Sequence, residues 1–278
     1  MIIYHKNCYD GYTAAHIVKK RFPESRMIPS SYGDDLPEVY LGDTVYIVDF
    51  SFPPEMIEDL CRMAVNVYVY DHHKSAIERL EYLKIDNLHM VLDVDRSGAQ
   101  ITWDELYPDQ EYPVLVAYTA DRDLWKWELP NSKEINRFIR LFKMSDFEAL
   151  EWNLENQLFN CVATGAILLR QSEKEVGFSC RNRRILNWGE HKVSVLNASH
   201  YISETGNRLA STDEVDFAAI WYIRSDGMVQ WGLRSVGDND VSSIAKKHGG
   251  GGHKNAAGFT LSLCQSLGLI TDVTRRDD

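Results

Sequence analysis

Short apolar runs followed by acids and histidines recur four times in the first half of this chain. The runs cover residues 2–4, 45–48, 67–70 and 114–118, and the polar residues that follow them are His5 and Asp10, Asp49, Asp71 to His73, and Asp121 and Asp123. We interpret the runs as buried strands, since they are rich in β-branched and aromatic residues. The carboxyl ends of parallel strands meet at one edge of a sheet, where these side chains would gather. Carboxylates crowded in this way repel one another unless cations lie among them, which predicts a cluster of divalent metal ions.

The strongest single motif is Asp71-His72-His73. One imidazole can ligate a metal ion while the acid orients that imidazole or bridges two ions. At the fourth run, Asp121 is the expected ligand because it comes first after the run, and Asp123 is the alternative. A polar strand end would account for any one of these motifs, but it does not explain why the same residue types follow several strands.

A run of four glycines lies between His248 and His253. Without side chains, backbone N–H groups can face an anion, and His253 can add a donor. Arg234, at the end of an earlier strand, can pair with a phosphate or a carboxylate. We therefore expect an anion-binding loop here, with a flexible turn and a surface arginine as the alternatives.

Alternating element signals predict the framework that positions these residues. Helices are expected at residues 13–22, 53–63, 75–83 and 97–106, which with the strands implies a parallel sheet covered by helices on both faces. A helical connector is expected between residues 132 and 182. Strand patterns return from residue 184, with Asp226-Gly227 as a hairpin turn, and a helix is expected at 241–247. The expected domains are residues 1–182 and a smaller α/β domain at 183–278, whose tail from Thr274 should fray.

Bulk composition restricts the class of protein. The chain has 278 residues, of which 44% are hydrophobic, enough for a sizeable core. Its net charge of −11 disfavours long duplex nucleic acid as a partner but not a small phosphorylated substrate. No run reaches the roughly 18 apolar residues of a membrane helix, and the start lacks a signal-peptide pattern. The five cysteines form no CxxC pair, so we expect free thiols in a cytoplasmic protein, as a monomer or a homodimer.

Taken together, the motifs resemble the DHH phosphoesterase family with a C-terminal DHH-associated domain. The resemblance covers nearly the whole chain and rests on HKNCYDG at 5–11, VDFS at 48–51, DHHKS at 71–75, TADRDLW at 119–125 and GGGGHKNAAGF at 249–259. It implies a two-manganese site in the first domain and substrate capture by the second domain across a cleft.

By position, the resemblance also implies residue roles. The implied metal ligands are His5, Asp10, Asp49, His72 and Asp121. Asp49 would bridge the ions, and His73 would lie nearest the scissile phosphate. Asp71 would either ligate an ion or hold one of its ligands in place. The implied contacts to the substrate's other phosphate or terminal nucleotide are Arg234, Gly250, Gly251, Gly252 and His253.

One position departs from the family pattern. Many relatives carry Asp-x-Asp in the first motif, where this chain has Cys8-Tyr9-Asp10. A thiol is a soft ligand that prefers zinc and other thiophilic metals. Cys8 therefore either changes the preference of one metal position or fills space beside it.

The expected function is metal-dependent hydrolysis of short oligoribonucleotides (nanoRNA) to mononucleotides. In this hypothesis two ions roughly 3.5–4 Å apart activate a hydroxide, and oxygen and imidazole ligands suit manganese. A compact chain without a basic stripe favours substrates of about two to five units over long polymers. The alternatives are a pAp phosphatase, a cyclic mono- or dinucleotide phosphodiesterase, and a catalytically silent nucleotide-binding regulator.

Overall fold

The computed structural model describes residues 1–274, with side chains up to residue 269. The chain divides into two compact units, Met1–Leu169 and a second that begins at Arg170. The division falls within the long helix α8 (Leu158–Ser179), whereas the sequence places the domain boundary after that helix. Among the described residues, no helix combines the length and the apolar character needed to cross a membrane.

The first unit is built on a five-stranded sheet in the order β2-β1-β3-β4-β5, with every neighbouring pair parallel. The strands are β1 (Ile2–His5), β2 (Met27–Ser30), β3 (Thr44–Val48), β4 (Asn66–Asp71) and β5 (Leu88–Leu92). The strands predicted at residues 2–4, 45–48 and 67–70 are thus confirmed. Strands β2 and β5, which lie at the two edges of this sheet, were not predicted from the sequence.

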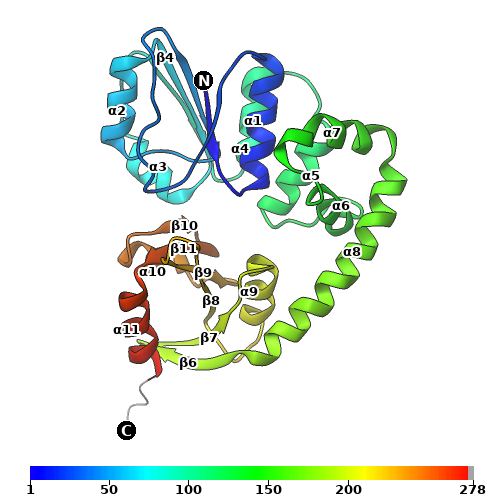
Figure 1. Cartoon of the computed structure of the whole chain (residues 1–278), viewed down its shortest axis with the longest axis vertical. Helices are drawn as coiled ribbons and strands as arrows, with labels where there is room; N and C mark the ends of the chain where they lie inside the picture. Colours follow the sequence, from blue (N-terminus) through cyan, green and yellow to red (C-terminus); the bar gives the residue numbers. More distant parts are fainter. Residues whose placement is uncertain (275–278) are drawn as a thin grey trace. The chain divides into compact units, whose positions relative to one another are not determined.

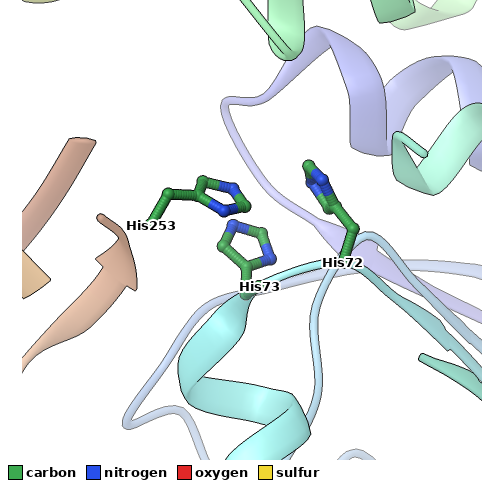
Figure 2. Close-up of side chains that lie close together, drawn as sticks. All are labelled: His72, His73 and His253. Carbon is green, nitrogen blue, oxygen red and sulfur yellow. The ribbon is translucent and has the colours of Figure 1, made fainter. Parts of the chain in front are cut away.

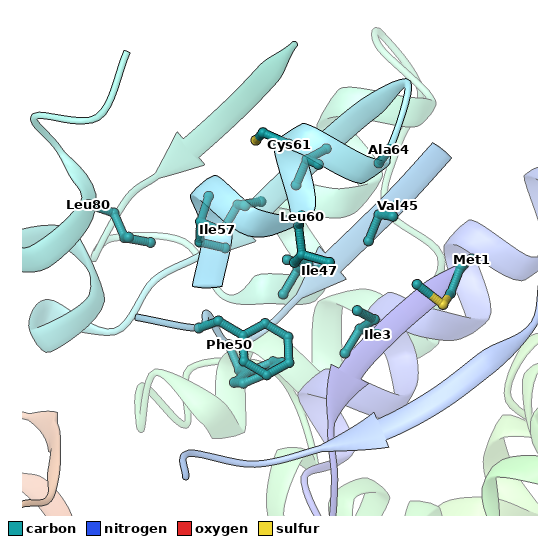
Figure 3. Close-up of a cluster of buried hydrophobic side chains, with 13 residues drawn as sticks. Met1, Ile3, Val45, Ile47, Phe50, Ile57, Leu60, Cys61, Ala64 and Leu80 are labelled. Atoms are coloured by element: carbon teal, nitrogen blue, oxygen red, sulfur yellow. The ribbon is translucent and has the colours of Figure 1, made fainter. Parts of the chain in front are cut away.

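Helices cover both faces of this sheet, as predicted (Figure 1). Their bounds are α1 (Tyr9–Arg21), α2 (Pro54–Met63), α3 (Lys74–Leu80) and α4 (Gly98–Leu106). Strand residues alternate between the faces, because successive side chains of a strand point in opposite directions. Ile3 and Ile47 pack with α2 and α3 (Figure 3), whereas Ile2 and Val48 pack with α1 and α4. Burial on both faces fixes the register and therefore the edge at which the polar residues emerge.

The fourth apolar run is a helix, so the strand predicted at residues 114–118 is wrong. Helix α5 (Val114–Asp123) begins directly after Pro113, and its buried residues include Leu115, Val116, Thr119 and Ala120. That spacing follows the period of a helix, which a five-residue apolar run alone does not distinguish from a strand. Helix α5 packs with α6 (Ser132–Ile139) and α7 (Phe147–Asn156), and the N-terminal part of α8 adds Cys161, in a third cluster of buried side chains.

Glu151 attaches α7 to α1. Its carboxylate lies 3.3 Å from Nε2 of His16 and 2.8 Å from Nζ of Lys20. The His16 and Lys20 contacts hold the pKa of Glu151 at about 2, below its ordinary value of 4.5. Because the folded-state pKa is the lower one, the stabilisation is present above about pH 4.5 and is lost as the pH falls toward 2.

We expect Glu151→Gln to lower the free energy of unfolding by about 1–3 kcal/mol at pH 7. The difference between this variant and the wild type should shrink as the pH falls from 4.5 toward 2. Urea unfolding across this pH range measures both effects. A difference that stays constant with pH would contradict the ionic contribution of Glu151.

The second unit contains a mixed sheet of six strands in the order β10-β11-β9-β8-β7-β6. The strands are β6 (Arg184–Trp188), β7 (His191–Asn197), β8 (Phe217–Ile223), β9 (Val229–Ser235), β10 (Gly251–His253) and β11 (Ala256–Leu261). Only β7 and β8 pair in parallel. The helices are α9 (Ile202–Ala210), α10 (Val241–Lys247) and α11 (Leu263–Thr274). The predicted hairpin β8–β9 and helix α10 are confirmed, whereas α9 and α11 were not predicted. Of the tail predicted to fray, Thr274 ends α11 and the residues after it lie outside the described part of the chain.

Candidate metal centre

The acids and histidines of the first three runs emerge at the carboxyl edge of the parallel sheet. His5 is the last residue of β1, Asp49 follows β3 directly, and Asp71 ends β4. Asp10 lies in the first turn of α1, which begins four residues after β1. The strand order places β1, β3 and β4 side by side, so these side chains converge at the edge where an open α/β sheet binds its ligands.

Asp49 is the centre of this cluster. Its Oδ1 lies 3.1 Å from Nε2 of His72, and its Oδ2 lies 3.5 Å from Nδ1 of His5. The same Nε2 of His72 is 3.8 Å from Oδ2 of Asp10 and 3.4 Å from Oδ2 of Asp123. These atoms form two possible metal-binding groups, each with ligand atoms within 4.8 Å of one another: His5, Asp49 and His73, and Asp10, Asp49 and His72. The two groups share Asp49.

Asp71 holds the two histidines that follow it. Its Oδ1 accepts hydrogen bonds from the backbone N–H groups of His72, at 2.8 Å, and His73, at 3.1 Å. The same oxygen lies 2.7 Å from Nδ1 of His73. His73 immediately precedes α3, and its ring and that of His72 project to the same side of the chain (Figure 2), with centroids 4.7 Å apart. Asp71 therefore fixes the orientation of His73 and leaves Nε2 as the ring nitrogen for chemistry.

Burial and mutual repulsion perturb the ionisation of these carboxyls. Burial, with the nearby charges of Asp49 and Asp123, raises the pKa of Asp10 well above its ordinary value. Burial also opposes the ionisation of Asp49, but His5 and His72, which lie beside its two carboxylate oxygens, hold its pKa well below its usual range. Burial acts against the charge on His72, yet Asp49 and Asp123 raise the pKa of His72 to about 10. Without a cation, protonated His72 supplies positive charge beside the buried carboxylates.

These residues fit divalent cations. Among the described residues, Oδ2 of Asp10, Asp49 and Asp71 are buried and accept no hydrogen bond. Buried carboxylate oxygens without donors are rare because their desolvation is costly. Carboxylate and imidazole ligands suit manganese, zinc and iron, and a bound cation would replace the proton on His72 as the counter-charge.

Two glycines allow this close packing, and one of them was missed in the sequence. A Cβ on Gly98, the first residue of α4, would lie 2.7 Å from Cβ of Asp49 and 2.9 Å from Oδ2 of Asp10. A Cβ on Gly11 would lie 2.5 Å from the carbonyl oxygen of His5. The backbone N–H of Ala99 also donates to Oδ1 of Asp10. Gly98 stood out in the sequence only as part of Ser97-Gly98 at a predicted helix start. No feature of the neighbouring sequence indicated that it would contact Asp10 and Asp49.

We expect Gly98→Ala to raise the Kd for Mn²⁺ about 10- to 100-fold, because the added methyl group must displace Asp49 or Asp10. Titration calorimetry measures this affinity. Gly177→Ala is the control, since a Cβ there meets only Arg208, at an ordinary 3.5 Å. A Gly98→Ala protein with wild-type metal binding would contradict the packing of Gly98 against Asp49 and Asp10.

The structure brings Asp123, and not Asp121, to the cluster. In the helix α5 the two residues point in different directions, whereas the expected strand end made Asp121 the first acid available. Oδ1 of Asp121 accepts a hydrogen bond from the backbone N–H of Glu128, and its Oδ2 accepts one from Ser132. Its carbonyl oxygen accepts bonds from Lys126 and Trp127. Asp121 thus anchors the loop between α5 and α6.

Cys8 lies beside the cluster without joining either metal-binding group. It is the N-cap residue of α1. Burial, together with the charges of Asp49, Asp123 and Asp10, raises the pKa of its thiol well above the ordinary value. The thiol therefore stays protonated in the metal-free protein, as expected of a residue that fills space between the carboxylates.

In the second unit the structure places His253 and Arg234 on one face of the sheet. Arg234 pairs with Ala256, and Ala256 pairs with His253. Directly opposite residues of antiparallel strands share a face. The guanidinium of Arg234 donates to the carbonyl of Leu233 and to Oγ of Ser203, so its position is fixed.

Half of the glycine run lies in a strand, where an anion-binding loop was expected. Gly251 and Gly252 belong to β10, which pairs with β11. A Cβ on Gly250 would lie 2.1 Å from the carbonyl oxygen of Gly258, and Gly252 has a φ of 137°, which disfavours other residues. The glycines therefore permit close strand packing, and their part in binding an anion remains a prediction.

Comparisons with known proteins agree with this architecture. The DHHA1 domain model matches residues 192–274. The uncharacterized protein R106 of Acanthamoeba polyphaga mimivirus is 29% identical, covering 94% of this chain and 67% of that protein. Oligoribonuclease NrnB of Bacillus subtilis (strain 168) is 27% identical, covering 79% of this chain and 60% of that protein. The crystal structure of RecJ from Thermus thermophilus in complex with Mn²⁺ has a similar fold, with a TM-score of 0.52 and 17% identity over 98% of this chain and 51% of that one.

Proposed function

Because this chain belongs to the DHH phosphoesterase superfamily and carries a C-terminal DHHA1 domain, we propose that it hydrolyses the phosphodiester bonds of short oligoribonucleotides to mononucleotides. The observation that carries the proposal is the pair of metal-binding groups that share Asp49. Two adjacent cations suit phosphoryl chemistry because they stabilise both the attacking and the leaving oxygen. The likeness to NrnB favours short RNA over other phosphoesters.

In this proposal His5, Asp49 and His73 hold one ion, and Asp10, Asp49 and His72 hold the other, with Asp123 beside His72. Mn²⁺ is the proposed metal in both positions, since the ligands are carboxylate oxygens and imidazoles and Cys8 belongs to neither metal-binding group. When bound, the ions supply Lewis acidity and a water of lowered pKa.

The protein's own residues position the reaction. Asp49 fixes the spacing of the two groups because it belongs to both. Asp71 keeps the ring of His73 in place through Nδ1, at 2.7 Å. The other ring nitrogen of His73, Nε2, is then available to ligate the ion that His73 shares with His5 and Asp49. In the second unit, Arg234 and His253 are proposed to contact the substrate's far phosphate or terminal nucleotide, as a guanidinium and an imidazole suit that anion.

A time course of product formation tests which substrate the protein cleaves. The purified protein is incubated with a 5′-phosphorylated RNA dinucleotide, pAp, a cyclic mononucleotide and a cyclic dinucleotide, each with Mn²⁺ and each with a chelator. We expect metal-dependent release of mononucleotides from the dinucleotide, at a rate that does not grow with length beyond about five units. Faster cleavage of pAp or of a cyclic nucleotide would assign the site to that substrate. Tight nucleotide binding without any cleavage would favour a regulator instead.

A further inference from the structure

Arg79 extends from α3 toward the metal centre. Helix α3 begins directly after His73, and Arg79 lies in its second turn. The Nε–H of Arg79 donates to the carbonyl oxygen of Ser75, at 2.9 Å. The side chain therefore runs back along the helix toward its N-terminus, where His73 stands.

Tyr32 connects the guanidinium of Arg79 to the histidines of the cluster. The centroid of the Tyr32 ring lies 5.7 Å from that of His5 and 6.0 Å from that of His73. Cζ of Arg79 lies 5.8 Å from the same ring. Tyr32 is 42% exposed, so part of this residue lies at the surface. Arg79 and Tyr32 therefore form the rim of the metal centre on the side of β2 and α3.

One donor of Arg79 has no acceptor. Nη2 is buried, and it makes no hydrogen bond to any residue of the described chain. A guanidinium stays charged at all physiological pH values, so a buried N–H without a partner is costly. Lys6, a nearby cation that follows β1, is already bonded to Asp34 at 2.8 Å. The structure thus leaves one cationic donor uncommitted near the metal centre, where the proposed reaction would bring a phosphate group.

We propose that Arg79 binds a phosphate group of the substrate through Nη2 and that Tyr32 packs against the nucleoside attached to it. This inference rests on the proposed phosphoesterase function and adds two residues that contact the substrate without contacting the metals. Guanidinium groups form strong, directional hydrogen bonds to phosphate oxygens. Aromatic rings stack on nucleobases of any sequence, which suits an enzyme for mixed short RNA.

Binding measurements test the role of Arg79. Inorganic phosphate and adenosine 5′-monophosphate are titrated by calorimetry into the Mn²⁺-loaded protein, as wild type, Arg79→Gln, Arg79→Lys and Arg62→Gln. We expect Arg79→Gln to raise the Kd of both ligands about 10- to 100-fold and Arg79→Lys to raise it less. Arg62 is the matched control, since its side chain is 66% exposed and pairs with Glu58 and Asp59 on α2. The Arg62→Gln protein should bind both ligands with wild-type affinity.

Tyr32→Leu separates the nucleoside contact from the phosphate contact. It should raise the Kd of the mononucleotide about 5- to 50-fold and leave that of inorganic phosphate within about twofold. Mn²⁺ affinity should be unchanged in the Arg79 and Tyr32 variants, and Arg79→Lys keeps the test valid if Arg79→Gln does not fold.

The two possible failures are distinguishable. Wild-type phosphate binding in folded Arg79 variants, with normal cleavage of the dinucleotide, would overturn the role of Arg79 alone. Absence of phosphate binding by the wild type would overturn it as well. Arg79-dependent phosphate binding without cleavage of any oligoribonucleotide would support the role of Arg79 and overturn the proposed reaction.

Discussion

Asp49→Asn is expected to lower kcat/KM for the dinucleotide by roughly 10³-fold or more, with the fold intact. Asp49 is the one residue shared by both metal-binding groups. An amide is a weaker ligand than a carboxylate and does not offset the charge of two cations. Bound ions contribute several kcal/mol to stabilising the transition state. Loss of their shared ligand should therefore lower kcat/KM by roughly 10³-fold or more.

The measurement combines steady-state kinetics with Mn²⁺ titration. Asparagine keeps an oxygen to accept from His72, so the circular dichroism spectrum should be unchanged and the free energy of unfolding should fall by no more than about 1–3 kcal/mol. Asp59→Asn, on the exposed side of α2, is the matched control and should keep full activity. A folded Asp49→Asn protein with normal turnover would rule out a shared ligand at this position.

Asp123→Asn is expected to impair metal binding and activity, whereas Asp121→Asn is expected to reduce stability. Asp123 places its carboxylate 3.4 Å from Nε2 of His72, so Asp123→Asn should weaken Mn²⁺ binding and lower kcat/KM about 10- to 100-fold. Asp121 is buried and accepts bonds from Glu128 and Ser132, so Asp121→Asn should lower the free energy of unfolding by about 2–4 kcal/mol.

Metal titration and urea unfolding of both variants make the comparison. The folded fraction of Asp121→Asn should bind Mn²⁺ with near wild-type affinity. Asp123→Asn should unfold at nearly the wild-type urea concentration when both proteins are free of metal. The reverse pattern, with metal binding lost in Asp121→Asn and kept in Asp123→Asn, would assign the ligand to Asp121.

The sequence predicted the parallel sheet well because its central strands are buried on both faces. The runs that precede His5, Asp49 and Asp71 are continuously apolar, and they form β1, β3 and β4. The edge strand β5 is only partly buried, and its pattern, with His89 exposed between apolar residues, did not stand out. The error at residues 114–118 arose because a five-residue apolar run fits a strand and a helix equally well.

The convergence of acids and histidines also followed from the sequence, since it depends only on which strand each residue ends. Contacts between distant segments did not follow from it. Gly98 packs against Asp49, and the Arg79 guanidinium contacts the ring of Tyr32. These residues are far apart in the sequence, so no local pattern predicts the contacts. Which of Asp121 and Asp123 faces the site depends on helical phase, which the mistaken strand concealed.

Titrating Mn²⁺ into chelator-treated protein, while following both bound metal and cleavage of a 5′-phosphorylated RNA dinucleotide, tests the central claim most directly. If Asp49 joins two metal positions in a phosphodiesterase, cleavage should be absent in the metal-free protein and should rise as the second equivalent of Mn²⁺ binds. Cleavage in the presence of chelator, or a protein that holds two equivalents and cleaves no phosphoester, would contradict that claim.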